Sequence, residues 1–219
     1  SGRWARFVAP NVKKLHVIDA SDEALAVAKR NLCRFDNVEF HLSPIVSNSL
    51  VDSSLDFAYC LGVLHHIPDI RHSLVAIHRK LKLGGRLLIY VYYAFDNRGW
   101  PYRLMWRLSD WCRRFISRLP FAWKRQVTDF IAVTVYWPLA KIASALSFLN
   151  VLPTWWPLSY YRDKKFYVMR TDSLDRFGTR LENRFTSRQI ESLLKESGFG
   201  EIEFSATAPF WCVKCVRSV

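Results

Sequence analysis

The segment Leu15-His16-Val17-Ile18-Asp19-Ala20-Ser21-Asp22 decides the fold, because it is an apolar strand that ends on a carboxylate and leads directly into a helix. In an open α/β sheet, ligands bind outside the carboxyl ends of the strands, and an acidic residue at the end of the second strand accepts hydrogen bonds from ribose hydroxyls. Asp19 therefore predicts a nucleoside-containing cofactor. The alternative interpretation is a solvated aspartate that caps the following helix, although Ser21 can already serve as that cap.

Strands and helices alternate downstream of this segment. Acidic residues open a helix expected over 22–34, and a helical stripe predicts a second helix over 70–81, with apolar residues at Ile70, Leu74, Ile77 and Leu81. Short apolar runs predict strands over 38–42, 55–61 and 86–92. Such alternation gives right-handed crossovers, so we expect a parallel sheet.

The end of the chain has a different pattern. Thr186 and Gln189 form a capping box at the start of a helix, and Gly198 marks its C-terminal end. Two strand-like runs follow, 201–206 and 210–216. They predict an antiparallel pair at the edge of the sheet.

Three motifs in the first part of the chain carry a family resemblance. They are Asp19 at the end of its strand, the run Asp56-Phe57-Ala58-Tyr59-Cys60-Leu61-Gly62-Val63-Leu64-His65-His66-Ile67-Pro68-Asp69, and the turn Leu81-Lys82-Leu83-Gly84-Gly85-Arg86-Leu87-Leu88-Ile89. In this order and spacing they resemble class I S-adenosylmethionine-dependent methyltransferases, and within that class the ubiquinone/menaquinone-biosynthesis type of small-molecule enzyme. The resemblance covers residues 1–95, and residues 160–199 resemble the C-terminal part of bacterial members.

The resemblance implies an α/β, Rossmann-like fold with a parallel sheet, an antiparallel edge strand and S-adenosyl-L-methionine as cofactor. We expect a cofactor-binding core over 1–95, a helical, basic and aromatic insert or lid over 96–170, and a helix and strands over 171–219 that complete the sheet. Such an enzyme methylates a small-molecule or a lipid- or carrier-linked acceptor. The alternatives are a non-catalytic nucleoside-binding or membrane-associated scaffold domain, and an RNA methyltransferase.

The chain opens with Ser1-Gly2 before a helix, which resembles the tail of a glycine-rich loop. The strand and the glycines that precede such a loop are absent, so we expect a fragment that lacks the first strand of the sheet. That strand is central in the family. We therefore expect these 219 residues to be poorly active or unstable by themselves.

The resemblance places the cofactor-binding residues at the strand ends. Asp19 would accept hydrogen bonds from both ribose hydroxyls. The other matching positions are Ser1 and Gly2 near the methionine moiety, Ala20 at the adenine edge, and Leu61 and Gly62 beside the cofactor. Family members follow the third strand with Gly-Asp-Ala, but this chain has Ser43-Pro44-Ile45 there, and proline offers neither a carboxylate nor an N–H. Adenine recognition would therefore rest on backbone groups and on apolar contact from Ile45.

Methyl transfer is an in-line displacement, so alignment of the acceptor supplies much of the rate, and a base is needed only when the acceptor must lose a proton. The candidates for that base are His65, Tyr92 and Tyr161, with Tyr93 and Tyr160 beside them. The alternative for His65 is a structural role in its loop. Adjacent side chains on one turn point apart, and no carboxylate stands at ligand spacing, so we expect no metal at His65-His66.

Residues 96–170 depart from the alternating pattern. The net charge of +13 calls for an anionic partner. An apolar helical stripe (Leu104, Leu108, Trp111, Phe115, Leu119) runs beside a basic one (Arg103, Arg107, Arg114, Arg118). We expect a helical lid over the acceptor pocket, with peripheral contact to an anionic membrane in addition. Nucleic acid is the less favoured partner, because no RNA-binding module is recognisable. The apolar run 131–152 is broken by Pro138 and carries Lys141, so we do not expect a membrane span.

The five cysteines are scattered and odd in number, which indicates a reducing compartment. We therefore expect a cytoplasmic protein with peripheral contact at the inner face of the membrane. Cys212 and Cys215 lie in a strand-like run, where side chains three positions apart face opposite sides, so we expect no zinc there.

Overall fold

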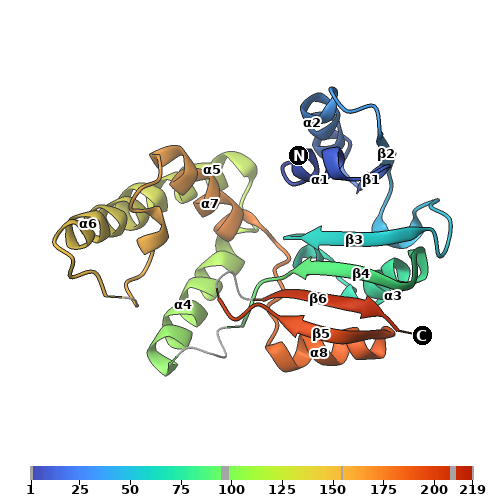
Figure 1. Cartoon of the computed structure of the whole chain (residues 1–219). Coiled ribbons are helices and arrows are strands. Elements are labelled where there is room, and N and C mark those ends of the chain that lie inside the picture. The colour runs from blue at the N-terminus through green and yellow to red at the C-terminus, as the bar shows by residue number, and fades with distance from the viewer. Residues whose placement is uncertain (1, 95–98, 154, 208–210, 219) are drawn as a thin grey trace. The chain divides into compact units, whose positions relative to one another are not determined.

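The computed structural model describes residues 2–94, 99–153, 155–207 and 211–218. It divides into two compact units: unit 1 comprises Ser1–Ala94 and Asn183–Val219, and unit 2 comprises Phe95–Glu182 (Figure 1). Unit 2 therefore includes residues 171–182, which the sequence analysis placed with the C-terminal strands. Each unit is described in turn below.

Unit 1 begins with two parallel strands and two helices: α1 (Ala5–Val8), β1 (Leu15–Asp19), α2 (Asp22–Leu32) and β2 (Val38–Leu42). The strands pair with Leu15 opposite Val38 and Asp19 opposite Leu42. A small core lies between these helices and strands and is formed by Ala5, Ala9, Leu15 and Leu32. Ser21 caps α2, because its hydroxyl accepts a hydrogen bond from the Ala24 N–H. The predicted helix and its cap are confirmed.

A four-stranded sheet with the order β3-β4-β6-β5 forms the rest of unit 1. The strands β3 (Leu55–Leu61) and β4 (Leu81–Tyr90) are parallel, and β6 (Cys212–Arg217) and β5 (Phe199–Phe204) are added antiparallel (Figure 1). Helices α3 (Ile70–Lys80) and α8 (Ser187–Glu196) contribute Leu74, Ile190 and Leu194 to its core. The expected antiparallel edge is confirmed. Phe210, the predicted start of the last strand, lies outside the described residues.

Strand β4 begins earlier than the sequence predicted. Leu81 pairs with Leu55, and pairing resumes at Arg86 opposite Phe57, so residues 82–85 form an irregularity within the strand. Gly84 has a φ of +75°, and a Cβ on Gly85 would lie 2.8 Å from the Lys82 carbonyl oxygen. The two glycines therefore bend a strand that has already begun, because only glycine fits these two positions.

The sheet of unit 1 is in two parts, where the sequence predicted one. Strands β1 and β2 form a separate pair. Within the described ranges no strand pairs with the second edge of β1 or with the second edge of β3. Tyr59 of β3 packs against the core of the β1–β2 pair, so the two parts are in contact. That a further strand pairs with these two edges of β1 and β3 stays a prediction.

Unit 2 is helical, with α4 (Trp100–Ile116), α5 (Phe121–Ile131), α6 (Trp137–Phe148) and α7 (Phe166–Gly178). A π-helical turn, η4 (Ala132–Tyr136), joins α5 to α6 without a break. Pro138 does not end this helix: it lies directly after the wide turn, at the start of α6, and the helix continues through it. Helix α7 belongs to this unit because it packs along α5. Its Ser173 hydroxyl donates to the Thr128 carbonyl at 2.8 Å, and Arg170 Nε donates to Asp129 at 2.9 Å.

Short 3₁₀ turns connect the longer elements: η1 (Ala9–Asn11), η2 (Ile45–Ser47), η3 (Leu64–His66) and η5 (Ser159–Tyr161). Leu119, which the sequence analysis assigned to the apolar stripe of α4, lies beyond the end of that helix. It packs into the core of unit 2 with Ile116 and Tyr136. The apolar stripe therefore ends at Phe115.

Candidate cofactor site

Asp19 ends β1 at the carboxyl edge of the strand pair, as the sequence predicted. Its Oδ1 accepts a hydrogen bond from the Ser21 N–H at 3.0 Å, which turns the chain from β1 into α2. Its carbonyl accepts from the Ser43 N–H at 3.0 Å, so the ends of β1 and β2 meet here. Among the residues that the structure describes, no donor engages Oδ2. The carboxylate therefore supports the turn and retains an acceptor for a ribose hydroxyl, with Ala20 exposed beside it.

Gly2 stands before α1 with a left-handed φ of +68°. A Cβ at this position would lie 3.1 Å from Leu32 Cδ1 and 3.4 Å from the Ala28 Cα, so the backbone passes close to α2. Both features require glycine. They agree with a loop that approaches a ligand closely, and Ser1, its predicted neighbour in the site, lies outside the described residues.

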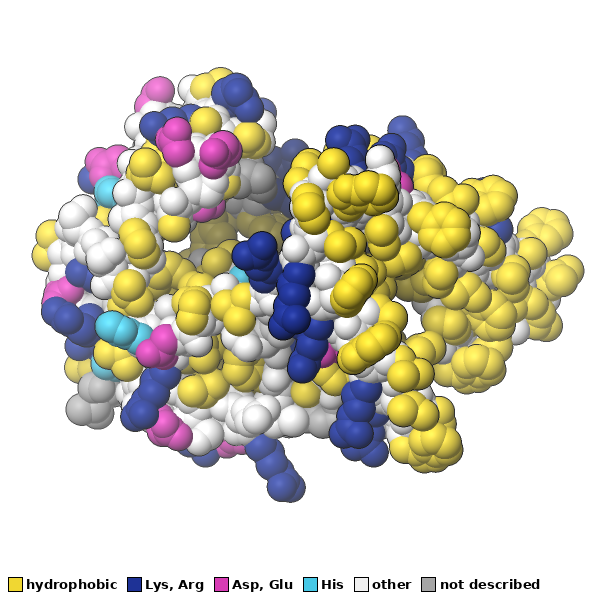
Figure 2. Space-filling view, turned by 180° about the vertical axis from the view of Figure 1, so that it is seen from behind, with side chains coloured by type: hydrophobic (Ala, Val, Ile, Leu, Met, Phe, Trp, Pro, Cys, Tyr) yellow, Lys and Arg dark blue, Asp and Glu magenta, His cyan; other side chains and the backbone are white. Residues whose placement is uncertain are grey.

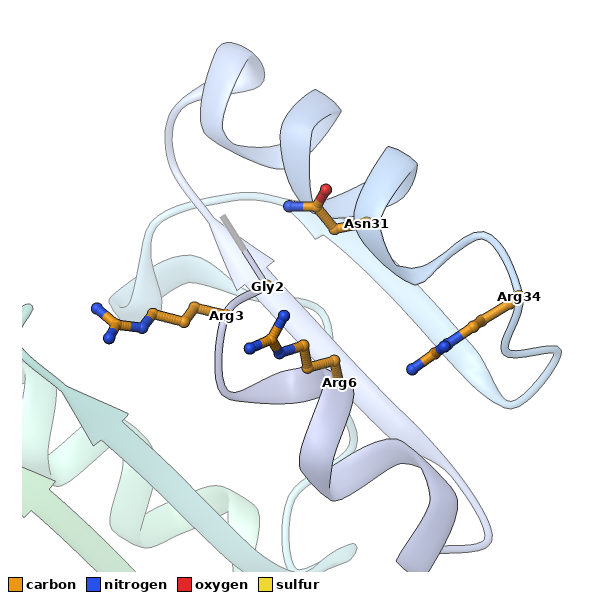
Figure 3. A pocket seen from close by; sticks show the side chains of 5 residues that line it. All are labelled: Gly2, Arg3, Arg6, Asn31 and Arg34. Carbon is orange, nitrogen blue, oxygen red and sulfur yellow. The ribbon is translucent and has the colours of Figure 1, made fainter.

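A hollow of about 520 Å³ beside Gly2 is lined by Arg3, Arg6, Asn31 and Arg34 (Figure 3). Figure 3 shows Arg6 and Asn31 on facing sides of this hollow, one from α1 and the other from α2. Guanidinium groups bind carboxylates and phosphates through paired hydrogen bonds. The arginines therefore offer a place for the anionic end of a ligand. The sequence analysis did not identify these arginines. The signal available in the sequence was that Arg3 and Arg6, about one helical turn apart, follow Gly2.

The segment after β2 contains a buried polar group that the sequence analysis also missed. The Ser43 Oγ is buried and has no hydrogen-bond partner among the described residues. A buried hydroxyl of this kind can be satisfied by a bound ligand or water. Ile45 begins η2 and packs, partly buried, against the core of the four-stranded sheet. Its contact with adenine stays a prediction.

Leu61 ends β3 opposite Tyr90, and Gly62 follows with a φ of +78°. The Gly62 N–H donates to the Tyr90 carbonyl at 3.0 Å, which fixes the turn at the carboxyl edge. Nothing lies within 4 Å of the place where a Cβ would stand on Gly62. Gly62 therefore allows the backbone to turn, and it leaves space beside it that a ligand could occupy.

His65 is fully buried in η3, in the loop after β3. Its ring stacks on that of Tyr92, with centroids 3.8 Å apart and an angle of 20° between the planes. Neither ring nitrogen has a hydrogen-bond partner within the described part of the chain. Burial, followed by the charges of His66 and Arg184, lowers the pKa of His65 to about 3. The imidazole is therefore neutral at physiological pH and a weak proton acceptor, which favours the structural interpretation. The catalytic role stays a prediction.

A short segment before α8 holds this loop in place. The Asn183 N–H donates to the His65 carbonyl at 2.8 Å, and its Nδ2 donates to the Ile67 carbonyl at 3.3 Å. The Phe185 N–H donates to the Tyr92 carbonyl at 3.0 Å, and the Arg184 guanidinium lies 5.1 Å from the Tyr92 ring centroid. These residues therefore position His65 and Tyr92. The sequence analysis missed them because they act through contacts distant in sequence.

Tyr161, the third predicted catalytic residue, belongs to unit 2. Its hydroxyl donates to Asp172 Oδ2 at 2.9 Å, and its ring lies 5.3 Å from that of Tyr136. Burial, then the Asp172 charge, raises the pKa of Tyr161 far above its ordinary value. The phenol therefore keeps its proton. The structure brings His65 and Tyr92 together in unit 1, and places Tyr161 in a hydrogen bond within unit 2.

A cluster that could coordinate a metal lies elsewhere on the strand pair. Register and alternation place His16, Glu39 and His41 on the face opposite the apolar residues that contact the helices. His16 Nδ1 lies 3.0 Å from His41 Nε2 and 3.4 Å from Glu39 Oε2. Two imidazoles and a carboxylate suit a transition metal, although Glu39 is also paired with Lys14 at 2.7 Å. The sequence analysis missed this cluster because its members come from two strands.

The buried His65 makes the stability of the fold depend on pH. Its folded pKa lies below the ordinary value of 6.5, so the unfolded state takes up a proton that the folded state excludes. The stabilisation is present above about pH 6.5 and is lost as the pH falls toward 3. Between pH 7 and pH 5 we expect a loss of about 2 kcal/mol from this residue. Urea unfolding of the wild type and of His65→Phe at both pH values measures this loss of stability.

The loss should be absent in His65→Phe, which keeps a buried ring against Tyr92 but cannot take up a proton. His72→Ala removes an exposed histidine from α3 and serves as the matched control, with the wild-type pH dependence retained. An unchanged pH dependence in His65→Phe would show that the buried imidazole is not responsible.

Comparison with known proteins finds a family match in the first part of the chain. Residues 1–89 match the family model described as "Methyltransferase domain". Phosphoethanolamine N-methyltransferase 2 of Caenorhabditis elegans is 24% identical over 183 residues, which is 82% of this chain and 37% of that protein. An uncharacterized methyltransferase of Bacillus subtilis is 30% identical over 99 residues, which is 44% of this chain and 39% of that protein. The chain thus spans less than half the length of these relatives.

A solved structure with the same fold is that of an S-adenosylmethionine-dependent methyltransferase from Methanosarcina mazei. It superposes with a TM-score of 0.53 at 15% identity and covers 98% of this chain and 85% of that one. The mixed sheet, the strand-end carboxylate and the domain match agree on S-adenosylmethionine as the cofactor. Residues 1–89 of this chain therefore match a methyltransferase domain, and the chain has the fold of a solved S-adenosylmethionine-dependent methyltransferase.

Proposed function

We propose that the protein transfers a methyl group from S-adenosylmethionine to a small or lipid-linked acceptor. The observation that carries this proposal is the carboxylate of Asp19 at the end of β1, within residues that match a methyltransferase domain. Asp19 would hold the ribose. The arginine-lined hollow beside Gly2 would receive the methionine carboxylate, and Gly62 would leave room beside the ligand.

The cofactor, when bound, supplies an electrophilic methyl group on a sulfonium sulfur. The chain contributes position and environment to this chemistry. His65 is neutral and weakly basic, and the Tyr161 phenol is held protonated by burial and Asp172. Neither group is suited to remove a proton before attack. An acceptor that attacks without prior deprotonation, such as a neutral amine, needs neither of these two groups as a base.

The acceptor class is inferred from unit 2 and from one relative. Helix α4 exposes Arg103, Arg107 and Arg114 next to its apolar stripe, and Arg118 is exposed in the turn that follows the helix. Guanidinium groups pair readily with phosphate. The Caenorhabditis elegans relative is named for phosphoethanolamine, which is a phosphorylated amine. Together these features support a phosphate-bearing acceptor, free or in a lipid, that is methylated on the cytoplasmic side of an anionic membrane.

The test is transfer of a labelled methyl group. The protein is incubated with methyl-labelled S-adenosylmethionine and, separately, with phosphorylated amines, with phospholipid vesicles and with structured RNA. We expect label in an amine or lipid fraction and none with Asp19→Ala. Label confined to RNA would contradict the acceptor class, and cofactor binding with no transfer to any acceptor would favour a non-catalytic scaffold.

A further inference from the structure

Helix α4 presents a continuous apolar face to the surroundings of unit 2. Its members are spaced four, four, three and four residues apart, which places them on one side of the helix: Trp100, Leu104, Leu108, Trp111 and Phe115. Each is between 48% and 73% exposed. In a soluble domain this side of an amphipathic helix is the one that is buried.

The long helix formed by α5, η4 and α6 also presents an apolar face to its surroundings. Large apolar side chains are exposed along it: Trp123 (63%), Phe130 (67%), Val133 (52%), Trp137 (46%) and Phe148 (87%). Figure 2 shows hydrophobic side chains gathered over the surface of unit 2, with Lys and Arg side chains beside them. A patch this extensive marks an interaction surface.

The interior of unit 2 contains buried polar and charged side chains beside its apolar core. Asp110, Arg113, Thr128 and Ser173 are buried. Arg113 Nε donates to Asp110 at 2.8 Å, and its Nη1 donates to the Thr179 carbonyl at 2.9 Å. Thr128 and Ser173 are joined through the hydrogen bond between α5 and α7. Buried charges with exposed tryptophans invert the usual distribution of a soluble domain. Such an arrangement is favourable when the outer surface faces hydrocarbon.

Basic side chains border the apolar face of α4. Arg103 and Arg107 on the helix and Arg118 in the turn after it are exposed and have no acidic partner among the described residues. Arg114 is 70% exposed although it contacts Asp110. Arginines beside a Trp-, Phe- and Leu-rich face suit the headgroup region of an anionic bilayer, where each adds electrostatic attraction.

The long helix lies on the membrane surface in this arrangement and does not cross the bilayer. Phe121–Phe148 is long and apolar enough to span one by length and composition, which taken alone is weak evidence. Its other side, however, packs against α7, which carries Arg170, Asp172 and Asp175. A span would draw these charges into hydrocarbon. An in-plane orientation keeps them on the aqueous side.

We propose that unit 2 docks on an anionic lipid bilayer, with the apolar faces of α4 and of α5–α6 inserted and the α4 arginines at the headgroups. The proposal does not rest on methyl transfer, because docking requires neither cofactor nor acceptor. A protein that binds vesicles but methylates nothing would overturn the proposed function alone.

Co-sedimentation with vesicles tests this docking. Vesicles of phosphatidylcholine with and without phosphatidylglycerol are used at two salt concentrations. The double variant Trp111→Ser/Phe115→Ser removes two exposed rings from α4 and should lower the bound-to-free ratio at least about tenfold. The matched control Val51→Ser/Leu83→Ser removes two apolar side chains of unit 1, each 73% exposed, and should bind as the wild type does.

Charge is tested separately. Arg107→Gln/Arg118→Gln should weaken binding to phosphatidylglycerol vesicles and leave the weaker binding to pure phosphatidylcholine unchanged, whereas Lys29→Gln/Arg30→Gln on α2 should change neither. The proposal is overturned if the wild type sediments with no vesicles, or if Trp111→Ser/Phe115→Ser binds as well as the wild type while remaining folded. Tight binding to structured RNA without vesicle binding would overturn it too, as would a dimer that depends on Trp111 and binds no vesicles.

Discussion

Replacing Asp19 by alanine is expected to weaken the binding of S-adenosylhomocysteine at least about tenfold, because charge-assisted hydrogen bonds are worth about 1.5–3 kcal/mol each. Isothermal titration of the folded variant measures the change. Asp19 also holds the turn into α2 through the Ser21 N–H, so the alanine variant alters two things. Asp19→Asn separates them, since an amide oxygen can still accept from Ser21 but carries no charge.

We expect Asp19→Asn to lose affinity while keeping the stability of the wild type. Asp22→Ala is the matched control, because Asp22 is an exposed aspartate three residues further along, in the first turn of α2. It should bind the ligand as the wild type does. An unchanged dissociation constant in folded Asp19→Ala would show that the ribose is not held at the end of β1.

Removal of the Asp110 carboxylate is expected to destabilise unit 2 by about 3 kcal/mol, because it leaves the charge of Arg113 buried without its partner. Asp110 is 9% exposed and pairs with Arg113 at 2.8 Å and with Arg114 at 2.9 Å. The Thr179 carbonyl still accepts from Arg113, which limits the loss. Urea unfolding of Asp110→Ala, followed by tryptophan fluorescence, measures the change.

The control for this variant is Asp163→Ala in the same unit. The Arg162–Asp163 pair is also close, at 3.1 Å, but the Asp163 side chain is 71% exposed. Exposed pairs are worth less than about 1 kcal/mol, so this variant should unfold close to the wild type. Equal effects of the two substitutions would contradict the view that the burial of the Asp110–Arg113 pair makes it important for the stability of unit 2.

The elements that could be predicted from the sequence are those fixed by local interactions. The Ser21 cap and the Thr186–Gln189 capping box act within one helical turn, and both are present. The parallel strands β3 and β4 follow from their apolar runs. Asp19 could be placed because a strand end and the following helix start are read from adjacent residues.

The remaining features depend on contacts that are distant in sequence. The hydrogen bonds from 183–185 to the His65 loop join segments more than a hundred residues apart, as the Asn183–Ile67 bond shows. The bulge at Gly84-Gly85 depends on how β4 pairs with β3. Helix α7 joins unit 2 through Thr128 and Asp129 of α5, which a boundary drawn from the sequence at residue 170 could not reveal.

The π-helical turn before α6 is another feature that was not predicted from the sequence. Pro138 indicated a break in the apolar run 131–152, because proline disrupts the interior of an α-helix. The structure places the wide turn Ala132–Tyr136 directly before Trp137, so that Pro138 stands in a first helical turn. The helix therefore continues, and with it the apolar face that unit 2 exposes.

The most direct test of the central claim, that this chain holds S-adenosylmethionine at the carboxyl edge of its parallel strands, is a calorimetric titration of the protein with S-adenosylhomocysteine. We predict a single saturable site that S-adenosylmethionine competes for and that Asp19→Ala weakens. A folded protein that binds neither compound would contradict the claim.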